Sequence, residues 1–298
     1  MGCSVFDVTL TALLMLVLLL PLACTEAGHA EPLRRPADRE AVYRSTPQRD
    51  LRLRVYLPPK ADAESESTPR PGVVLFHGGG WLQGGMGHLQ SQAAELAALG
   101  VVAVCPEYRV RETDGTTPID ALTDALHAFA WVREHADALG IDPERLAAGG
   151  GSAGGQLAAA CATMTDEKLA ELAPALAGLR RPDALILFNP VIDNGPDGYG
   201  HERLGDAYRW FSPLHNLRPG LPPTLILLGT DDHLVPVTTA EAYVQAMQAH
   251  GNACELELYD GQVHGFFNAR PNNPMYRATL DRAILFLQDM QWIEPAGP

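Results

Sequence analysis

The sequence has few basic residues for its number of acids. It holds 22 Lys and Arg against 36 Asp and Glu in 298 residues, which gives a formal net charge of −14. Nucleic acids and anionic membrane surfaces require clustered Lys and Arg, and the sequence has no such cluster. We therefore expect no nucleic-acid partner. The acidity favours solubility and says little about chemistry.

Cysteine is also scarce, and metal-binding motifs are missing. The five cysteines follow no spacing typical of metal ligands or of a disulfide framework. The sequence contains no H-E-x-x-H motif, and no Gly-Lys-Ser or Gly-Lys-Thr that would bind phosphate. We therefore expect no metal and no cofactor.

The longest apolar run lies near the N-terminus, over residues 8–23. It is short for a membrane span and has the size of a signal-peptide core, although residues 1–7 lack the usual Lys or Arg. We interpret residues 1–27 as a signal peptide or leader, and expect a periplasmic or extracellular protein. An uncleaved anchor, or a lipid anchor on Cys24, is the alternative.

The rest of the chain predicts one domain. Residues 28–49 are expected to form a flexible arm, because their Arg, Pro and Asp residues show no apolar periodicity. Residues 50–57 alternate polar and apolar side chains, which is typical of an antiparallel edge strand. The folded, catalytic domain is expected over residues 50–292, since one core suits this length and a 46% hydrophobic content.

From residue 72 onwards, short apolar runs alternate with stretches of helical length. This pattern is typical of a parallel sheet covered on both faces. We predict an α/β fold with a mostly parallel, doubly wound sheet and an antiparallel N-terminal edge. The expected strands are 73–76, 101–105, 146–149, 184–189, 224–229 and 255–259, and the expected helices are 89–99, 119–138, 153–164, 239–250 and 276–290.

A glycine-rich turn carries the first candidate for catalysis. Gly150-Gly-Ser152-Ala-Gly154 fits G-x-S-x-G and lies between an apolar strand and an alanine-rich helix, the context that this motif requires. The sharp turn strains the backbone of the serine and leaves little room for side chains beside it. We predict Ser152 as a nucleophile, with the backbone N–H of Ala153 placed to stabilise an oxyanion.

A second glycine run, His77-Gly-Gly-Gly-Trp81, directly follows an expected strand, at the sheet edge where open sheets bind ligands. We expect the N–H groups of Gly79 and Gly80 to complete an oxyanion hole with Ala153, and Gly78 stays an alternative. His77 and Trp81 are expected to brace the loop, with Trp81 also bordering the substrate.

A serine hydroxyl needs a base whose pKa lies near the working pH, and histidine is the natural one. Of ten histidines, His264 follows the last expected strand in a glycine-bearing loop. The loop after the preceding strand holds two acids, and we choose Asp232 over Asp231 from the spacing Gly-x-x-Asp-x-x-Val-Pro. The chain order Ser, Asp, His is that of α/β-hydrolases.

These motifs resemble those of bacterial α/β-hydrolases of the hormone-sensitive-lipase and acetyl-esterase type, over roughly residues 51–291. Further segments are similar to exported esterases related to acetylxylan and feruloyl esterases, namely Glu107-Tyr-Arg109, Gly140-Ile-Asp-Pro143, Ser212-Pro-Leu214 and Gly265-Phe-Phe-Asn268. The resemblance implies a compact site that releases acetate or cinnamate-type acids from plant polysaccharides. The chain lacks an obvious N-terminal helical cap, which argues against long-chain lipid substrates.

We therefore expect a serine carboxylesterase that hydrolyses short-chain acyl esters through an acyl-enzyme. The expected substrate is a small-molecule or polysaccharide ester, with acetyl or feruloyl groups on carbohydrate. One alternative is an amide hydrolase, either a peptidase or an arylformamidase, with the same three residues. The other is a catalytically silent binding module, which the fold permits.

One long segment, residues 193–222, has no clear period. Long irregular segments inside compact domains are usually functional or mobile, and this one is expected to be a partial lid. Aromatic faces stack well on sugar or cinnamoyl rings. We expect the segment to form one wall of the substrate pocket, through Tyr199 and Trp210 in particular. The alternative is that its rings only anchor a structural loop; they are Tyr199, His201, Tyr208, Trp210 and Phe211.

Overall fold

The computed structural model describes residues 31–59 and 68–295. The predicted leader over residues 1–27, with Cys24, lies outside the described residues. Within the described ranges, no helix is both long enough and apolar enough to cross a membrane.

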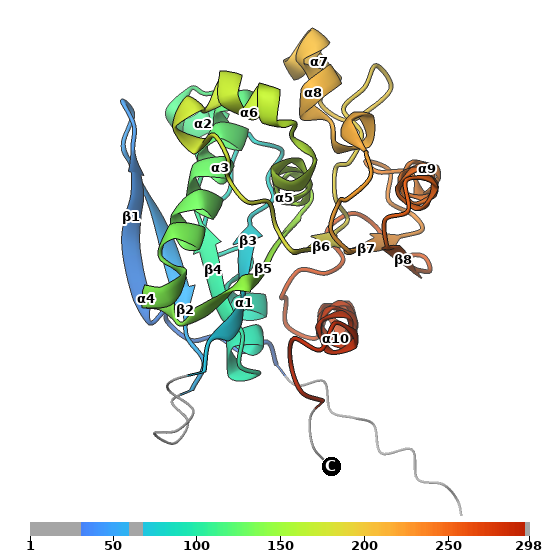
Figure 1. Ribbon diagram of the computed structural model, residues 1–298. Coiled ribbons are helices and arrows are strands. Elements are labelled where there is room, and N and C mark those ends of the chain that lie inside the picture. Colours follow the sequence, from blue (N-terminus) through green and yellow to red (C-terminus); the bar gives the residue numbers. More distant parts are fainter. Residues whose placement is uncertain (1–30, 60–67, 296–298) are drawn as a thin grey trace, which may run out of the picture.

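One eight-stranded sheet organises the chain, in the order β1-β2-β4-β3-β5-β6-β7-β8 (Figure 1). The pairs β1·β2 and β2·β4 are antiparallel, and all the other pairs are parallel. The prediction of a mostly parallel sheet with an antiparallel N-terminal edge is confirmed. The strands are β1 (Arg39–Ser45), β2 (Asp50–Tyr56), β3 (Arg70–Phe76), β4 (Val102–Pro106), β5 (Ile141–Gly151), β6 (Ala184–Phe188), β7 (Thr224–Gly229) and β8 (Cys254–Tyr259).

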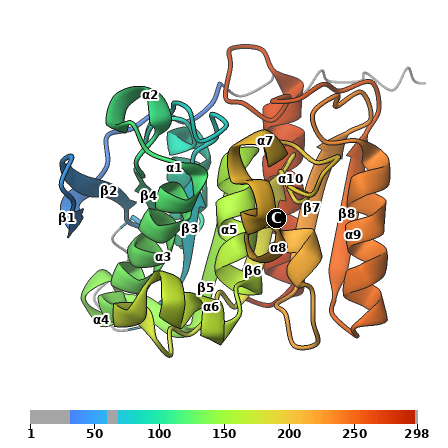
Figure 2. The same ribbon diagram turned by 90° about the horizontal axis from the view of Figure 1, so that it is seen from above.

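Helices cover both faces of the sheet (Figure 2). Because neighbouring residues of a strand point to opposite faces, Val74 and Phe76 of β3 pack in one apolar cluster and Val73 and Leu75 in the other. Residues of α3 (Pro118–Glu134), α5 (Ala153–Thr163) and α9 (Val237–Ala249) belong to the first cluster, and those of α1 (Gln90–Ala98) and α10 (Pro274–Asp289) to the second. The shorter helices are α2 (Arg111–Asp114), α4 (Ala136–Leu139), α6 (Asp166–Leu172), α7 (His201–Leu204) and α8 (Tyr208–Phe211).

The N-terminal edge differs from the prediction. Residues 28–49 are not wholly a flexible arm, because β1 pairs with β2 and takes the edge position that we expected for β2. No period-two pattern marks β1, whose residues are mostly exposed. Contacts with distant residues hold it instead, such as the hydrogen bond of 2.7 Å from the Tyr43 hydroxyl to the carbonyl oxygen of Glu107.

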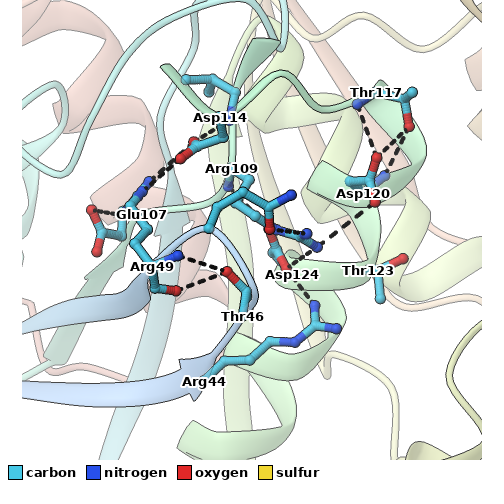
Figure 3. Close-up of polar contacts among 12 residues, drawn as sticks. Arg44, Thr46, Arg49, Glu107, Arg109, Asp114, Thr117, Asp120, Thr123 and Asp124 are labelled. Atoms are coloured by element: carbon cyan, nitrogen blue, oxygen red, sulfur yellow. Dashed lines mark hydrogen bonds and ion pairs between the residues drawn. The ribbon is translucent and has the colours of Figure 1, made fainter. Parts of the chain in front are cut away.

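A buried carboxylate joins this edge to the helical layer (Figure 3). Asp124 of α3 is fully buried, and Arg109 donates to it from Nε at 2.8 Å and from Nη2 at 3.0 Å. Arg44 of β1 pairs with the same carboxylate. The neighbouring Arg49 pairs with Asp114 at 2.9 Å. These ion pairs bring β1, the segment after β4 and α3 together.

Candidate active site

The turn between β5 and α5 exposes Ser152 at the carboxyl end of a central strand. Its backbone has φ 55° and ψ −120°, a conformation that L-residues rarely adopt. The turn is tight, since a Cβ atom on Gly154 would lie 2.1 Å from the carbonyl oxygen of Phe76. This strained geometry is what a nucleophile at a strand-to-helix turn requires.

His264 and Asp232 lie beside this serine. Nε2 of His264 is 2.8 Å from Oγ of Ser152, and Nδ1 is 2.7 Å from Oδ2 of Asp232. Since the carboxylate can only accept, Nδ1 carries the proton and the lone pair of Nε2 faces the serine hydroxyl. The histidine is thereby poised to take the hydroxyl proton of Ser152.

Asp232 is held rigidly, and the second acid of the loop is not. The Asp232 side chain is fully buried, and its Oδ1 accepts hydrogen bonds from the backbone N–H of Leu234 and Val235 at 2.9 and 3.0 Å. Asp231 is exposed. The structure therefore places Asp232, and not Asp231, against His264.

The glycine run after β3 presents free amides next to Ser152. The carbonyl oxygen of Gly79 accepts from the N–H groups of Leu82 and Gln83 at 3.0 and 3.2 Å, which points the N–H of Gly80 the other way across a trans peptide. Gly79 has φ 122°, and a Cβ atom there would lie 1.9 Å from the carbonyl oxygen of Gln83. Only glycine fits this approach of the two chain segments.

The alternative of Gly78 as an oxyanion donor is disfavoured. Its N–H donates to Nδ1 of His88 at 2.9 Å and is therefore occupied. Among the described residues, the N–H groups of Gly79, Gly80 and Ala153 have no protein acceptor. This set of three amides can receive a negative oxygen next to Ser152.

His77 supports the loop from behind. Its ring stacks on Tyr108 with 3.9 Å between ring centroids, and the Tyr108 hydroxyl donates to the His77 carbonyl oxygen at 2.8 Å. Burial lowers the pKa of His77 to about 4, so the ring is neutral. Nδ1 donates to the carbonyl oxygen of Gly78 at 2.8 Å. These contacts are those of a bracing residue.

A cleft of about 940 Å³ opens over Ser152 and His264. Glycines line much of it, including Gly84, Gly85 and Gly87. Arg54 and Glu107 contribute charged groups. This volume lies in the range of small-molecule sites.

Two of the three predicted substrate-contacting residues do not line this cleft. Trp81 is 1% exposed, with its ring packed against Phe211 and Tyr199. Trp210 packs against Phe211, with the Lys168 ammonium 5.1 Å from its ring centroid. Both indoles are used for packing within the fold, which agrees with the bracing role expected of Trp81, and their contact with substrate stays a prediction. Tyr199 does line the cleft.

Asn189 is a residue of the site that the sequence analysis missed. It follows β6 with φ 33°, and its Oδ1 accepts from the N–H of Gly265 at 2.8 Å. Its Nδ2 lies 3.4 Å from Nε2 of His264. A polar residue at the carboxyl end of a parallel strand was the available signal, since that edge of the sheet carries the site.

The fold and this turn together define the class of the protein. A mostly parallel sheet with helices on both faces, and with a strained serine at the turn after a central strand, is the architecture of an α/β hydrolase. The chain matches the family described as alpha/beta hydrolase fold over residues 73–208 and 197–268, and it belongs to this family.

The relatives and structural neighbours are ester hydrolases. The carboxylesterase NlhH of Mycobacterium tuberculosis is 31% identical over 242 residues, which cover 74% of this chain and 72% of that protein. An acetylxylan esterase of Xylanibacter ruminicola is 32% identical over 65% of this chain and only 40% of its own length. An esterase of Thermogutta terrifontis, solved with propionate bound, has a TM-score of 0.79 and 37% identity, covering 88% of this chain and 97% of that one. The chain therefore groups with serine hydrolases that act on esters.

Proposed function

We propose that this protein is a serine carboxylesterase that hydrolyses short-chain acyl esters with Ser152, His264 and Asp232 as its catalytic triad. The observation that carries the proposal is the continuous pair of hydrogen bonds, 2.8 Å from Ser152 to His264 and 2.7 Å from His264 to Asp232. Three protein groups with complementary roles meet there, at the base of an open cleft.

The geometry supports a two-step reaction. Oγ of Ser152 attacks the ester carbonyl carbon while Nε2 of His264 takes the hydroxyl proton, and the charge on the carbonyl oxygen is received by the N–H groups of Gly79, Gly80 and Ala153. His264 then donates the proton to the leaving alcohol, which leaves an acyl-enzyme on Ser152.

Water completes the cycle. His264 takes a proton from a water molecule as this attacks the acyl-enzyme, and then returns a proton to Oγ as the acid departs. In both steps the buried Asp232 stabilises the imidazolium and holds its orientation.

For the substrate, we propose acetyl or feruloyl groups on carbohydrate. The similarity to an acetylxylan esterase supports this choice, and the propionate bound in a solved esterase neighbour supports a short acyl group. The wide cleft, with its glycine-lined wall, leaves room for a bulky alcohol. We also propose that the chain is exported through the leader over residues 1–27, with the lipid anchor on Cys24 as the alternative.

The decisive experiment compares Ser152→Ala with Ser45→Ala, whose hydroxyl lies on the outer strand β1. Hydrolysis of p-nitrophenyl acetate should fall by about 10⁴-fold or more in Ser152→Ala and stay unchanged in the control. Paraoxon should add its phosphoryl group to the peptide that contains Ser152, as it phosphorylates the Thermogutta terrifontis esterase. Wild-type turnover by Ser152→Ala would overturn the proposal.

A substrate panel tests the finer statement. We expect p-nitrophenyl esters to be cleaved faster with acetyl than with decanoyl groups, and acetylated xylan or methyl ferulate to be hydrolysed. Faster cleavage of matched amides than of esters would identify an amide hydrolase instead. Activity on p-nitrophenyl acetate without any on the carbohydrate or ferulate esters would remove the proposed natural substrates.

A further inference from the structure

His88 connects the two loops that carry the proposed catalytic groups. It lies between the glycine run and α1, where its Nδ1 accepts a hydrogen bond of 2.9 Å from the N–H of Gly78. Its Nε2 is 2.6 Å from Oδ1 of Asn268, which ends the turn that begins beside His264.

Both contacts require one particular form of the ring. An amide N–H can only donate, so Nδ1 must carry a lone pair, and Nε2 must then carry the proton that is donated to Asn268. Burial lowers the pKa of His88, and the charge of Arg270 acts in the same direction. The neutral ring is thereby favoured.

The first contact fixes the oxyanion loop. The N–H of Gly78 is held by His88, and its carbonyl oxygen is held by Nδ1 of His77 at 2.8 Å. The next carbonyl oxygen, that of Gly79, is held by Leu82 and Gln83. Because these contacts fix the peptide planes before and after Gly79, the free N–H groups of Gly79 and Gly80 have a set direction.

The second contact fixes the turn of the catalytic histidine. The N–H of Asn268 donates to the carbonyl oxygen of Gly265 at 3.2 Å, and the Asn268 carbonyl oxygen accepts from Nδ2 of Asn273 at 2.8 Å. His88 therefore bonds to a side chain that is anchored in this turn. Phe267 of the same turn also packs near the His88 ring, with 5.9 Å between centroids.

We propose that His88 is a positioning residue that sets the distance between the oxyanion amides and His264. It acts through Gly78 and Asn268. The role rests on the proposed esterase function, because only an enzyme that stabilises an oxyanion needs these two loops at a fixed distance from each other. Preorganised donors of this kind stabilise the transition state more than the bound substrate.

The test replaces His88 with Asn or Gln, whose side-chain amides each mimic one of the two ring nitrogens. In His88→Asn, Oδ1 takes the place of Nδ1 and can accept from Gly78, while the link to Asn268 is lost. In His88→Gln, the side-chain amide nitrogen of Gln takes the place of the ring Nε2 and can donate to Asn268, while the acceptor for Gly78 is lost. His88→Ala removes both links.

For p-nitrophenyl acetate, we expect kcat of His88→Ala to fall about 10- to 100-fold, with KM within about twofold. His88→Asn and His88→Gln each keep only one of the two links, so the kcat of both should also stay well below that of the wild type. His250→Ala, at the exposed end of α9, serves as the control and should match the wild type.

Three outcomes would overturn the positioning role. They are a wild-type kcat in His88→Ala, a wild-type kcat in either amide variant, and a loss that lies in KM alone. If His88→Ala does not fold, the kcat values of His88→Asn and His88→Gln against the wild type decide alone. An inactive Ser152→Ala together with a fully active His88→Ala would refute this inference and leave the esterase proposal standing.

Discussion

The guanidinium of Arg203 donates a hydrogen bond of 2.7 Å to the carbonyl oxygen of Gly80. Arg203 belongs to α7, in the irregular segment 193–222, and Gly80 to the glycine run after β3. The Cζ atom of Arg203 lies 5.4 Å from the ring centroid of Trp81 and 5.0 Å from that of Tyr199. Arg203 thus links the segment 193–222 to the glycine run.

This contact predicts an effect of Arg203→Met on catalysis. The substitution keeps an apolar stem over the two rings and removes the donor to Gly80. We expect kcat on p-nitrophenyl acetate to fall about five- to tenfold, which corresponds to about 1–1.4 kcal/mol. The control is Arg209→Met, at an exposed position of α8. Equal kcat values for the two variants would show that the hydrogen bond from Arg203 to Gly80 does not affect catalysis.

Tyr199 and Trp210 are predicted to differ, although both belong to the aromatic segment. Tyr199 lines the cleft and Trp210 does not. Tyr199→Ala should lower kcat/KM for methyl ferulate at least about fivefold more than for p-nitrophenyl acetate, because a stacking face is lost. Trp210→Ala should change both substrates equally and lower the melting temperature. A loss for methyl ferulate alone in Trp210→Ala would show that Trp210 contacts the substrate.

The parts of the site that follow strands were predictable. Ser152, Asp232 and His264 each come after an expected strand, and parallel strands place their carboxyl ends at one edge of the sheet. This topological rule brought together residues that are up to 112 positions apart in sequence.

Contacts that depend on side-chain direction could not be read from the sequence. Trp81 follows a glycine run with a φ of 60°, and nothing in the order of residues tells whether its ring points into the cleft or into the core. Strand β1 lacks an apolar pattern, since its attachment depends on Tyr43 and Arg44 meeting distant partners. Local periodicity carries no information of this kind.

The buried Asp124 should be a large contributor to stability. Its loss leaves the charges of Arg109 and Arg44 without their shared partner, and breaking a buried ion pair on one side costs about 3–5 kcal/mol. We expect Asp124→Ala to lower the free energy of unfolding in urea by about that amount. Glu171→Ala removes an ion pair to Lys168 whose Glu side chain is 71% exposed, and should cost about 0.5 kcal/mol or less. Similar losses of unfolding free energy in both variants would contradict the role of Asp124 in attaching β1 through Arg44.

The width of the cleft can be tested at Gly85. A Cβ atom added there would meet no atom within 4 Å, so a larger side chain can enter the cleft without displacing the fold. Gly85→Trp should leave kcat/KM for ethyl acetate within about twofold of the wild type, and lower it at least about tenfold for acetylated xylan or p-nitrophenyl decanoate. Gly85→Ala is the matched control, because its single methyl group fills little of the volume. If Gly85→Trp lowers kcat/KM for small and bulky esters alike, while its melting temperature is unchanged, then bulky groups do not bind along this wall.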